Sequence, residues 1–490
     1  MKLLKLNNSA ATNSLLLTFV RLMTMTMGLL SIKLLSVYFS LQEYGTYSQA
    51  ILVAQTITSL SILGLTDATN YFYNKTTEIS AQKKYIATIF SIQCVIGIVC
   101  GILVIILNNP ISWYFSNPDV KKYLIVIAFR PLLDNLIMMF QTLFVSIGKA
   151  KIIALRNFLV SLIRLITVAV ACLIVKDIFT VICMSMIVDI VQVLYFYLLF
   201  RKYKNPIRIS DADKKLIREI LSFSIPMSIY VLTNYVSIHI DRYVIGAFTN
   251  TEMLAIYSNA ARKLPFDILT LSLITVLIPI LTRMINRQEY AKANDIFKLY
   301  LRIGYIITFI FVGGAIAVSK DLMLFLYDTK YLAGLSVFII YLVVDMIRFA
   351  NVTAILTGAG KTKILMTVSV VTMFLNAIFN VVGYKLWGFA GPAIVTLLLT
   401  IGMILMLLHF GAKEIKTTVI KLFNFKEITI VVIQIIIVGS GAYSLSSFMV
   451  ENNIPYVIRF IACYGIYILV LGLLNYRRVI ECYRKLNQYK

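Results

Sequence analysis

The sequence predicts an all-α polytopic membrane protein with about fourteen transmembrane helices, arranged as two parallel six-helix lobes and two additional C-terminal helices. Of its 490 residues, 60% are hydrophobic and only 14% are charged, and the mean hydropathy is +0.87. A chain with so little polar surface cannot cover a soluble globule of this size. Its apolar runs of roughly 20 residues or more are long enough to cross a bilayer as helices, and they lack the alternation typical of a membrane β-barrel.

The two lobes are predicted from an internal repeat. Residues 148–152 read Gly-Lys-Ala-Lys-Ile and residues 360–364 read Gly-Lys-Thr-Lys-Ile, an offset of 212. Tyr-Ser-Gln-Ala at 47–50 reappears as Tyr-Ser-Asn-Ala at 257–260, and Asp134 corresponds to Asp345. A repeat of about 211 residues built from membrane spans is typical of two-lobed transporters.

The predicted domains follow from this repeat. Residues 1–200 and 220–410 form the lobes, 201–219 form a basic cytoplasmic linker, and 411–490 add two helices and a tail. Because each copy contains six spans, both start from the same side of the membrane, so the lobes are parallel and not inverted. The predicted spans are 14–40, 48–72, 85–107, 122–146, 152–175, 178–200, 220–247, 254–282, 299–319, 332–356, 364–384, 391–410, 428–449 and 456–475.

The distribution of basic residues orients these spans. The predicted inner segments contain 29 Lys and Arg residues, whereas the outer segments contain six. Since cytoplasmic loops are enriched in Lys and Arg, both termini are expected to be cytoplasmic. The formal net charge of +24 is spread over eight short inner segments. It therefore suits contact with anionic membrane lipids and argues against nucleic-acid binding.

Cofactor and metal chemistry find little support in the sequence. The six cysteines form no paired spacing, and the two histidines lie in separate predicted spans, so we expect no metal site. Gly360-Lys361-Thr362 resembles the end of a phosphate-binding loop, but Ile355 stands where that motif needs its first glycine. We therefore expect no catalytic residues and no nucleotide hydrolysis, and either an ion gradient or the gradient of the substrate is the expected source of energy.

Ionisable residues inside spans are the candidates for function, because each costs roughly 2.5–3.5 kcal/mol at the membrane centre. Arg21, Lys33 and Arg164 have no opposite charge within one turn of their own helices. Lys33, like Arg459, lies near a span end from which it could reach the interface. The predicted ligands of an anionic substrate share a cationic or polar side chain within a span: Arg21, Lys33, Arg130, Arg164, Arg242, Arg348 and Asn376.

Three same-helix pairs permit a structural alternative. Arg130 and Asp134, Lys263 and Asp267, and Asp345 and Arg348 are spaced so that each pair can meet on one helix face. Asn376 occupies the position of Arg164 in the second copy, so a polar stripe on the same helix of both lobes is either a cavity wall or a helix–helix contact.

Three aspartates are the predicted ion-coupling residues, because a carboxylate in a low-dielectric site can bind and release a proton near neutral pH. They are Asp67, Asp134 and Asp345. Arg130 and Arg348 could hold the last two permanently ionised. Asp67 has no cation within a turn and is therefore the preferred candidate.

Several motifs resemble the signature of bacterial polysaccharide flippases of the O-antigen (Wzx) type, within the multidrug/oligosaccharidyl-lipid/polysaccharide exporter superfamily. They extend over nearly the whole chain: Ser-Ile-Pro at 224–226, Asp-Arg at 241–242, Ile-Gly at 245–246, Tyr-Ser at 257–258, Glu-Tyr-Gly-Thr-Tyr at 43–47, Gly-Leu at 64–65, Gly-Lys at 148–149 and Gly-Phe-Ala-Gly-Pro-Ala at 388–393.

This resemblance implies a substrate and a mechanism. The expected substrate is an oligosaccharide linked to undecaprenyl pyrophosphate. It is moved from the inner to the outer leaflet of the bacterial cytoplasmic membrane by alternating access, driven by protons or sodium. A glycan polymerase and a chain-length regulator are the expected protein partners. The nearest alternatives are a multidrug or cation antiporter and a lipid II flippase of the same fold. A membrane-bound polysaccharide polymerase is a further alternative, although the longest predicted outer loop, 108–121, contains neither His nor Cys.

Overall fold

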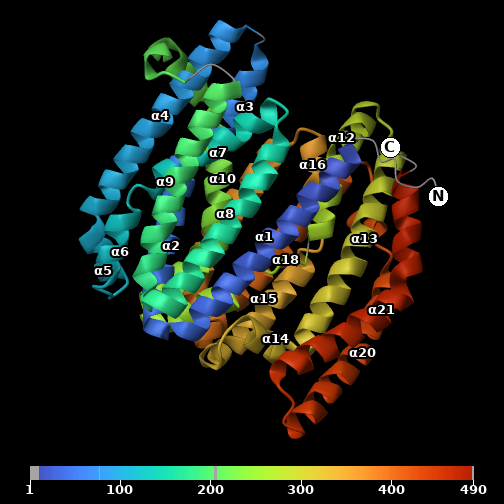
Figure 1. The fold of residues 1–490 in the computed structure, drawn as a ribbon. Helices are drawn as coiled ribbons and strands as arrows, with labels where there is room; N and C mark the ends of the chain where they lie inside the picture. The colour runs from blue at the N-terminus through green and yellow to red at the C-terminus, as the bar shows by residue number, and fades with distance from the viewer. Residues whose placement is uncertain (1–9, 77, 204–206, 267, 488–490) are drawn as a thin grey trace, which may run out of the picture. The chain divides into compact units, whose positions relative to one another are not determined.

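The computed structural model describes residues 10–76, 78–203, 207–266 and 268–487, and the regular secondary structure in these ranges is helical throughout (Figure 1). Contacts divide the chain into two compact units. The first comprises Met1–His239 and Gly246–Ala255, and the second comprises Ile240–Ile245 and Ile256–Lys490. The division falls within the helices of residues 214–248 and 251–260 and not at the predicted linker. The lobe boundaries drawn from the sequence repeat remain a prediction.

Within the described residues, the first unit contains nine complete α-helices, most of a tenth and part of an eleventh. Its helical elements are α1 (Ala10–Tyr38), α2 (Leu41–Ser61), α3 (Leu65–Lys75), α4 (Ile79–Ile106), α5 (Asn108–Tyr114), α6 (Val120–Ile127), α7 (Arg130–Ser146), α8 (Ala150–Val170) with the π-helical turn η1 (Ala171–Val175), α9 (Ile178–Tyr203), η2 (Ile209–Asp211) and most of α10 (Lys214–Phe248). A buried aromatic core of Phe140, Phe144, Phe196 and Phe200 joins α7 to α9.

The second unit contains the remaining helices. They are α11 (Thr251–Ala260), which the two units share, α12 (Ile268–Asn286), α13 (Tyr290–Ala317), α14 (Ser319–Leu326), η3 (Thr329–Gly334), α15 (Leu335–Ile347), α16 (Ala354–Gly358), α17 (Thr362–Trp387), η4 (Gly388–Ala390), α18 (Gly391–Glu414), α19 (Val419–Leu422), α20 (Phe425–Glu451) and α21 (Tyr456–Asn487). Helices α20 and α21 pack along α13 (Figure 1).

The prediction of a multi-pass helical membrane protein is confirmed. Within the described residues, eleven helical segments are long and apolar enough to cross a membrane, and one of them, Thr362–Glu414, contains two predicted spans. The eleven therefore correspond to twelve of the fourteen predicted spans. Of the other two, 220–247 lies within α10, whereas 254–282 is wrong as a continuous helix because α11 ends at Ala260 and α12 begins at Ile268.

Three further predicted spans are also interrupted. The span 48–72 breaks between α2 and α3, where Leu63 and Gly64 have φ values of 44° and 65° that no right-handed helix allows. The span 122–146 breaks between α6 and α7, and 332–356 breaks between α15 and α16. The break before α12 also removes Lys263 from any helix, so the proposed same-helix pair with Asp267 is wrong, and Asp267 itself lies outside the described residues.

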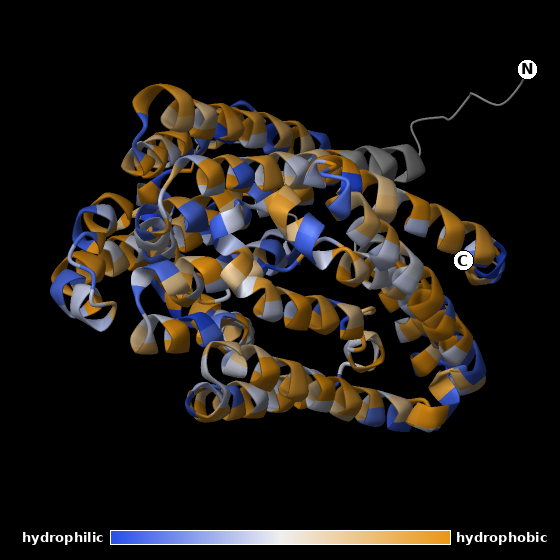
Figure 2. Ribbon diagram, turned by 90° about the horizontal axis from the view of Figure 1, so that it is seen from below, coloured by the Kyte–Doolittle hydropathy of each residue, from blue (hydrophilic) through white to orange (hydrophobic). Residues whose placement is uncertain are grey.

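The outward faces of the long helices are apolar. On α4, Val95, Ile102 and Ile106 expose 62%, 47% and 65% of their surface, and they follow one helix face. Figure 2 shows hydrophobic residues along most helices and hydrophilic residues concentrated in the turns. Such faces need hydrocarbon as their solvent.

The repeated Gly-Lys strings adopt the same local structure in both copies. Gly148 and Gly360 have φ values of 73° and 69°. The Lys149 N–H donates to the Phe144 carbonyl at 2.8 Å and Gly148 donates to Val145 at 2.9 Å. In the second copy the equivalent bonds end at Leu356 and Thr357, at 2.8 and 3.1 Å. Both turns are therefore Schellman caps that close one helix just before the next begins.

The last two helices are attached to the second unit by buried ion pairs at both ends. Near one end, Asp321 of α14 accepts hydrogen bonds from Arg459 of α21 at 2.5 Å and from Ser446 of α20 at 2.6 Å. Near the other end, Glu427 of α20 accepts from Arg302 and, at 2.6 Å, from Tyr305, both on α13. The expectation that Arg459 only reaches toward the interface is wrong, since its side chain is 12% exposed and ion-paired.

Between these ends, α21 lies against glycines of α13. A methyl group at Gly314 would come within 2.5 Å of the Tyr467 ring. The absence of side chains at Gly313 and Gly314 thus permits the close contact with Tyr467.

We expect Gly148→Ala and Gly360→Ala each to destabilise the protein by about 1–2 kcal/mol, because the left-handed conformation is unfavourable for a residue with a Cβ atom. A Cβ at either position would meet no atom within 4 Å, so backbone conformation alone sets the cost. Thermal unfolding of the purified protein in detergent measures the effect. Gly402→Ala, in an open helical position of α18, is the control and should be neutral or slightly stabilising. Equal unfolding temperatures for Gly148→Ala and Gly402→Ala would contradict the assignment.

Candidate functional site

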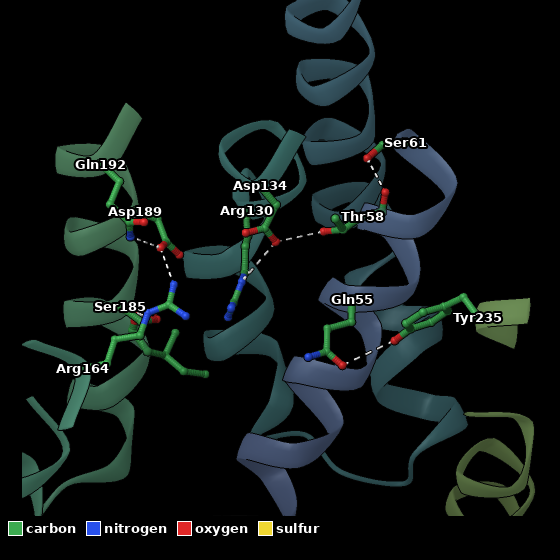
Figure 3. A network of polar contacts seen from close by, with 11 residues as sticks. Gln55, Thr58, Ser61, Arg130, Asp134, Arg164, Ser185, Asp189, Gln192 and Tyr235 are labelled. Carbon is green, nitrogen blue, oxygen red and sulfur yellow. Dashed lines mark hydrogen bonds and ion pairs between the residues drawn. The ribbon is translucent and has the colours of Figure 1, made fainter. Parts of the chain in front are cut away.

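A polar network in the first unit consists of two hydrogen-bonded clusters, one between α2 and α7 and one between α8 and α9, within an otherwise apolar bundle (Figure 3). Three predicted site residues, Arg130, Asp134 and Arg164, belong to it. The network also includes Arg156 and Asp189.

Asp189 of α9 is the central acceptor of the network. Its side chain is completely buried, and its Oδ1 accepts from Arg164 Nη2 at 2.5 Å and from Gln192 Nε2 at 2.8 Å. Arg164 comes from α8, 25 residues earlier, and its side chain is 42% exposed. Arg164 is therefore neutralised by a carboxylate of another helix, which a search along its own helix could not reveal.

Arg156 is a second arginine of α8 and was not among the predicted site residues. It lies eight residues before Arg164, about two helical turns away. Its Nη2 donates to the Gln192 side-chain oxygen, its Nη1 donates to Asn157 at 2.8 Å, and its guanidinium lies 5.3 Å from the Phe196 ring centre. All its hydrogen-bond acceptors in the described part of the chain are neutral amides. The repeat of arginines on one side of a predicted span was the signal that could have identified it.

The predicted Arg130–Asp134 pair forms on α7, with 3.5 Å between Arg130 Nε and Asp134 Oδ2. Thr58 of α2 donates to the same carboxylate oxygen at 3.3 Å, as Figure 3 shows. The neighbouring Asn135 donates to Ser61 of α2 at 2.9 Å. These contacts join α2 to α7 and give the pair a structural role.

The charges of this network do not cancel. Arg130, Arg156 and Arg164 supply three positive charges, and Asp134 and Asp189 supply two negative charges. Arg164 remains partly accessible, so one side of the network is open. A cationic excess held by arginines in a low-dielectric bundle is suited to binding a phosphate or another acidic group.

The other predicted residues of the first unit lie on α1 and α3. Arg21 of α1 is exposed and Lys33 is half-buried. Asp67 is exposed in the first turn of α3, and no contact from a described residue neutralises it.

In the second unit, the predicted site residues make mostly structural contacts. Asp345 is buried and accepts at 3.1 Å from the Leu264 N–H, in the break before α12. Arg348 donates to Thr400 of α18 at 3.2 Å, and Arg242 donates to the Ala261 carbonyl at 3.4 Å. Asn376 is buried in α17 and accepts from Asn380 at 2.8 Å. Whether these four residues bind substrate stays a prediction.

A buried carboxylate missing from the predicted site joins α10 to α15. Asp241 is 2% exposed and accepts from the hydroxyl of Tyr341 and from the Arg242 backbone N–H. Its position next to Arg242 in the sequence was visible, but its partner Tyr341 lies 100 residues away. No group of three or more His, Cys, Asp or Glu residues in the described ranges is arranged to hold a metal ion.

Removing Arg164 should be more harmful than removing its partner's charge. Arg164→Ala leaves the Asp189 carboxylate buried without its cation, which typically costs about 3–5 kcal/mol. Asp189→Asn leaves a partly exposed arginine that water can solvate and should cost less. Adding Asp189→Asn to Arg164→Ala should restore part of the lost stability. Thermal unfolding of the four proteins measures this, and equal, additive losses would show that the pair is not coupled.

Comparisons with known proteins agree with this architecture. Residues 10–285 match the model of a family described as polysaccharide biosynthesis protein. Among 21 matching chains of solved structures is the lipid II flippase MurJ in an inward closed conformation, with a TM-score of 0.75 and 16% identity over 95% of this chain and 100% of that chain.

Two further structures extend the comparison. An inward-facing multidrug resistance MATE transporter of the MOP superfamily has a TM-score of 0.68 and 14% identity, over 81% of this chain and 98% of that one. A MOP superfamily transporter from Pyrococcus furiosus Vc1 (DSM3638) has a TM-score of 0.60 and 12% identity, over 82% and 94%. No curated protein sequence matches. Because the family model matches more than half of the chain and these structures share its fold, the protein belongs to the polysaccharide biosynthesis protein family and has the fold of MOP superfamily transporters.

Proposed function

We propose that this protein is a flippase that moves an oligosaccharide linked to undecaprenyl pyrophosphate across the bacterial cytoplasmic membrane by alternating access. O-antigen, capsule and exopolysaccharide repeat units are the candidate glycans. The family match and the transporter fold support movement of a lipid-linked precursor. Arg156, the arginine of this network that has no carboxylate partner among the described residues, carries the proposal.

The chemistry of a pyrophosphate suits this arginine. Its two described hydrogen-bond acceptors are neutral amide oxygens of Asn157 and Gln192. Exchanging them for phosphate oxygens replaces neutral hydrogen bonds with charge-assisted ones, which are roughly twice as strong. The partly exposed Arg164 can contribute to the same headgroup without leaving Asp189. The polyprenyl tail meanwhile stays in the hydrocarbon of the bilayer. The same hydrocarbon surrounds the apolar outer faces of the helices.

A multidrug or cation antiporter is the principal alternative, since such a transporter shares the fold. An exporter of cations needs a carboxylate that the substrate can approach. In the network of the first unit, both carboxylates already have arginine partners. The charge excess therefore favours an anionic substrate there.

Location and partners follow from the same proposal. The excess of Lys and Arg on the predicted inner segments supports cytoplasmic termini. A glycan polymerase and a chain-length regulator would use the exported repeat unit.

We expect Arg156→Gln to lower the flipping rate by about 10- to 100-fold, the loss of one charge-assisted hydrogen bond worth about 1.5–3 kcal/mol. The assay uses proteoliposomes loaded with a fluorescent oligosaccharide on undecaprenyl pyrophosphate and measures its exposure to an external quencher. Lys214→Gln, an exposed cation outside the network, is the control. Full activity of Arg156→Gln would remove this residue from the site, and inactivity of the unsubstituted protein toward every such glycan would contradict the substrate class.

We further propose that flipping is coupled to an ion gradient through Asp67. Its exposed position, without a neutralising contact from described residues, leaves it free to exchange a proton, whereas Asp134 is paired with Arg130 and Asp345 accepts a backbone N–H. Proteoliposomes under imposed proton or sodium gradients should flip faster, and Asp67→Asn should lose this acceleration. Flipping that is indifferent to both gradients would refute coupling. Acceleration that survives in Asp67→Asn would assign it to another carboxylate.

A further inference from the structure

A cavity of about 610 Å³ lies in the second unit, apart from the network of the first. Its wall is formed by the first half of α13, the segment from α19 to the start of α20, and the last turns of α21. All three belong to segments with an excess of basic residues that are predicted to face the cytoplasm. The volume falls within the range of small-molecule sites.

The cavity wall carries more positive than negative charge. Lys298, Lys421 and Lys485 come from α13, α19 and α21, and their side-chain ammonium groups make no hydrogen bond or ion pair with the described residues. Arg302 also lines the cavity, but Glu427 neutralises it. Among the described residues that line the cavity, Asp295 is the one acidic residue, so three unpaired lysines share the wall with one carboxylate.

The start of α20 adds to this potential. Asn424 caps the helix by accepting from the Glu427 N–H at 3.3 Å, and both Asn424 and Phe425 line the cavity. The helix is 27 residues long, so the positive end of its dipole lies at the cavity wall. Phe425 is 55% exposed beside it, which places an aromatic ring where a membrane interface is expected.

The cavity wall thus combines a helix N-terminus with three lysines that come from separate segments and have no carboxylate partners. This arrangement suits an anion with several acceptor oxygens. We infer that this cavity binds a phosphate-bearing group on the cytoplasmic side, either the headgroup of an anionic phospholipid or a soluble phosphate ester. This inference is independent of the proposed flippase activity, because the cavity shares no residue with the Arg156 network.

Binding is tested with the purified full-length protein in neutral detergent. One arm measures retention of phosphatidylglycerol by native mass spectrometry, with phosphatidylcholine as the zwitterionic reference. The other arm measures binding of radiolabelled glycerol phosphate by equilibrium dialysis. We expect the triple variant K298Q/K421Q/K485Q to weaken whichever ligand binds by at least tenfold. The triple variant K298R/K421R/K485R should retain binding because it preserves the charge.

The matched control is K214Q/K215Q/K363Q, which removes the same charge from exposed positions outside the cavity. It should leave binding unchanged. Loss of phosphatidylglycerol alone would assign the site to a lipid headgroup, and loss of glycerol phosphate would assign it to a soluble ester. Equal effects of the two glutamine variants, or no binding of either ligand by the unsubstituted protein, would overturn the inference.

Discussion

Hydrocarbon cannot solvate a carboxylate, and this constraint determines which helices of the protein are joined. Each buried or half-buried acidic side chain in the described spans receives a donor from another helix or from a helix break. Asp134 joins α7 to α2, Asp189 joins α9 to α8, and Asp241 joins α10 to α15. Asp345 fixes the chain before α12, while Asp321 and Glu427 attach the last two helices. Apolar packing surrounds these contacts, but it would tolerate other rotations of the helices more readily than these hydrogen bonds do.

The same constraint explains how far the sequence could be interpreted. Hydropathy and charge bias predicted the spans, because length and composition are properties of each segment alone. They missed the breaks at 62–64, 128–129, 261–266 and 348–353, since an apolar run has the same composition whether or not it bends. The break before α12 depends on Asp345, which lies 81 residues from the N–H that it accepts. No window along the chain contains both groups.

The candidate site was predicted in part for a similar reason. Spacing along one helix identified the Arg130–Asp134 pair, and the structure contains it. Spacing could not show that Asp189 neutralises Arg164 from another helix, so Arg164 was predicted to be an unpaired cation, and Arg156 was not among the predicted residues. A local pattern shows which charges can meet on their own helix. Which arginine is left without a carboxylate partner can be seen only when the helices are packed together. The surplus of arginine over aspartate is thus a property of the bundle.

The double attachment of α20 and α21 limits how the second unit can move. Releasing either end leaves a carboxylate, Asp321 or Glu427, buried without its arginine, at a cost of about 3–5 kcal/mol. By that estimate, an arrangement with one end detached from α13 or α14 has a population of roughly one in 150 or less. The hairpin of α20 and α21 therefore has no separate hinge, and it travels with α13 as a rigid body whenever the second unit changes conformation.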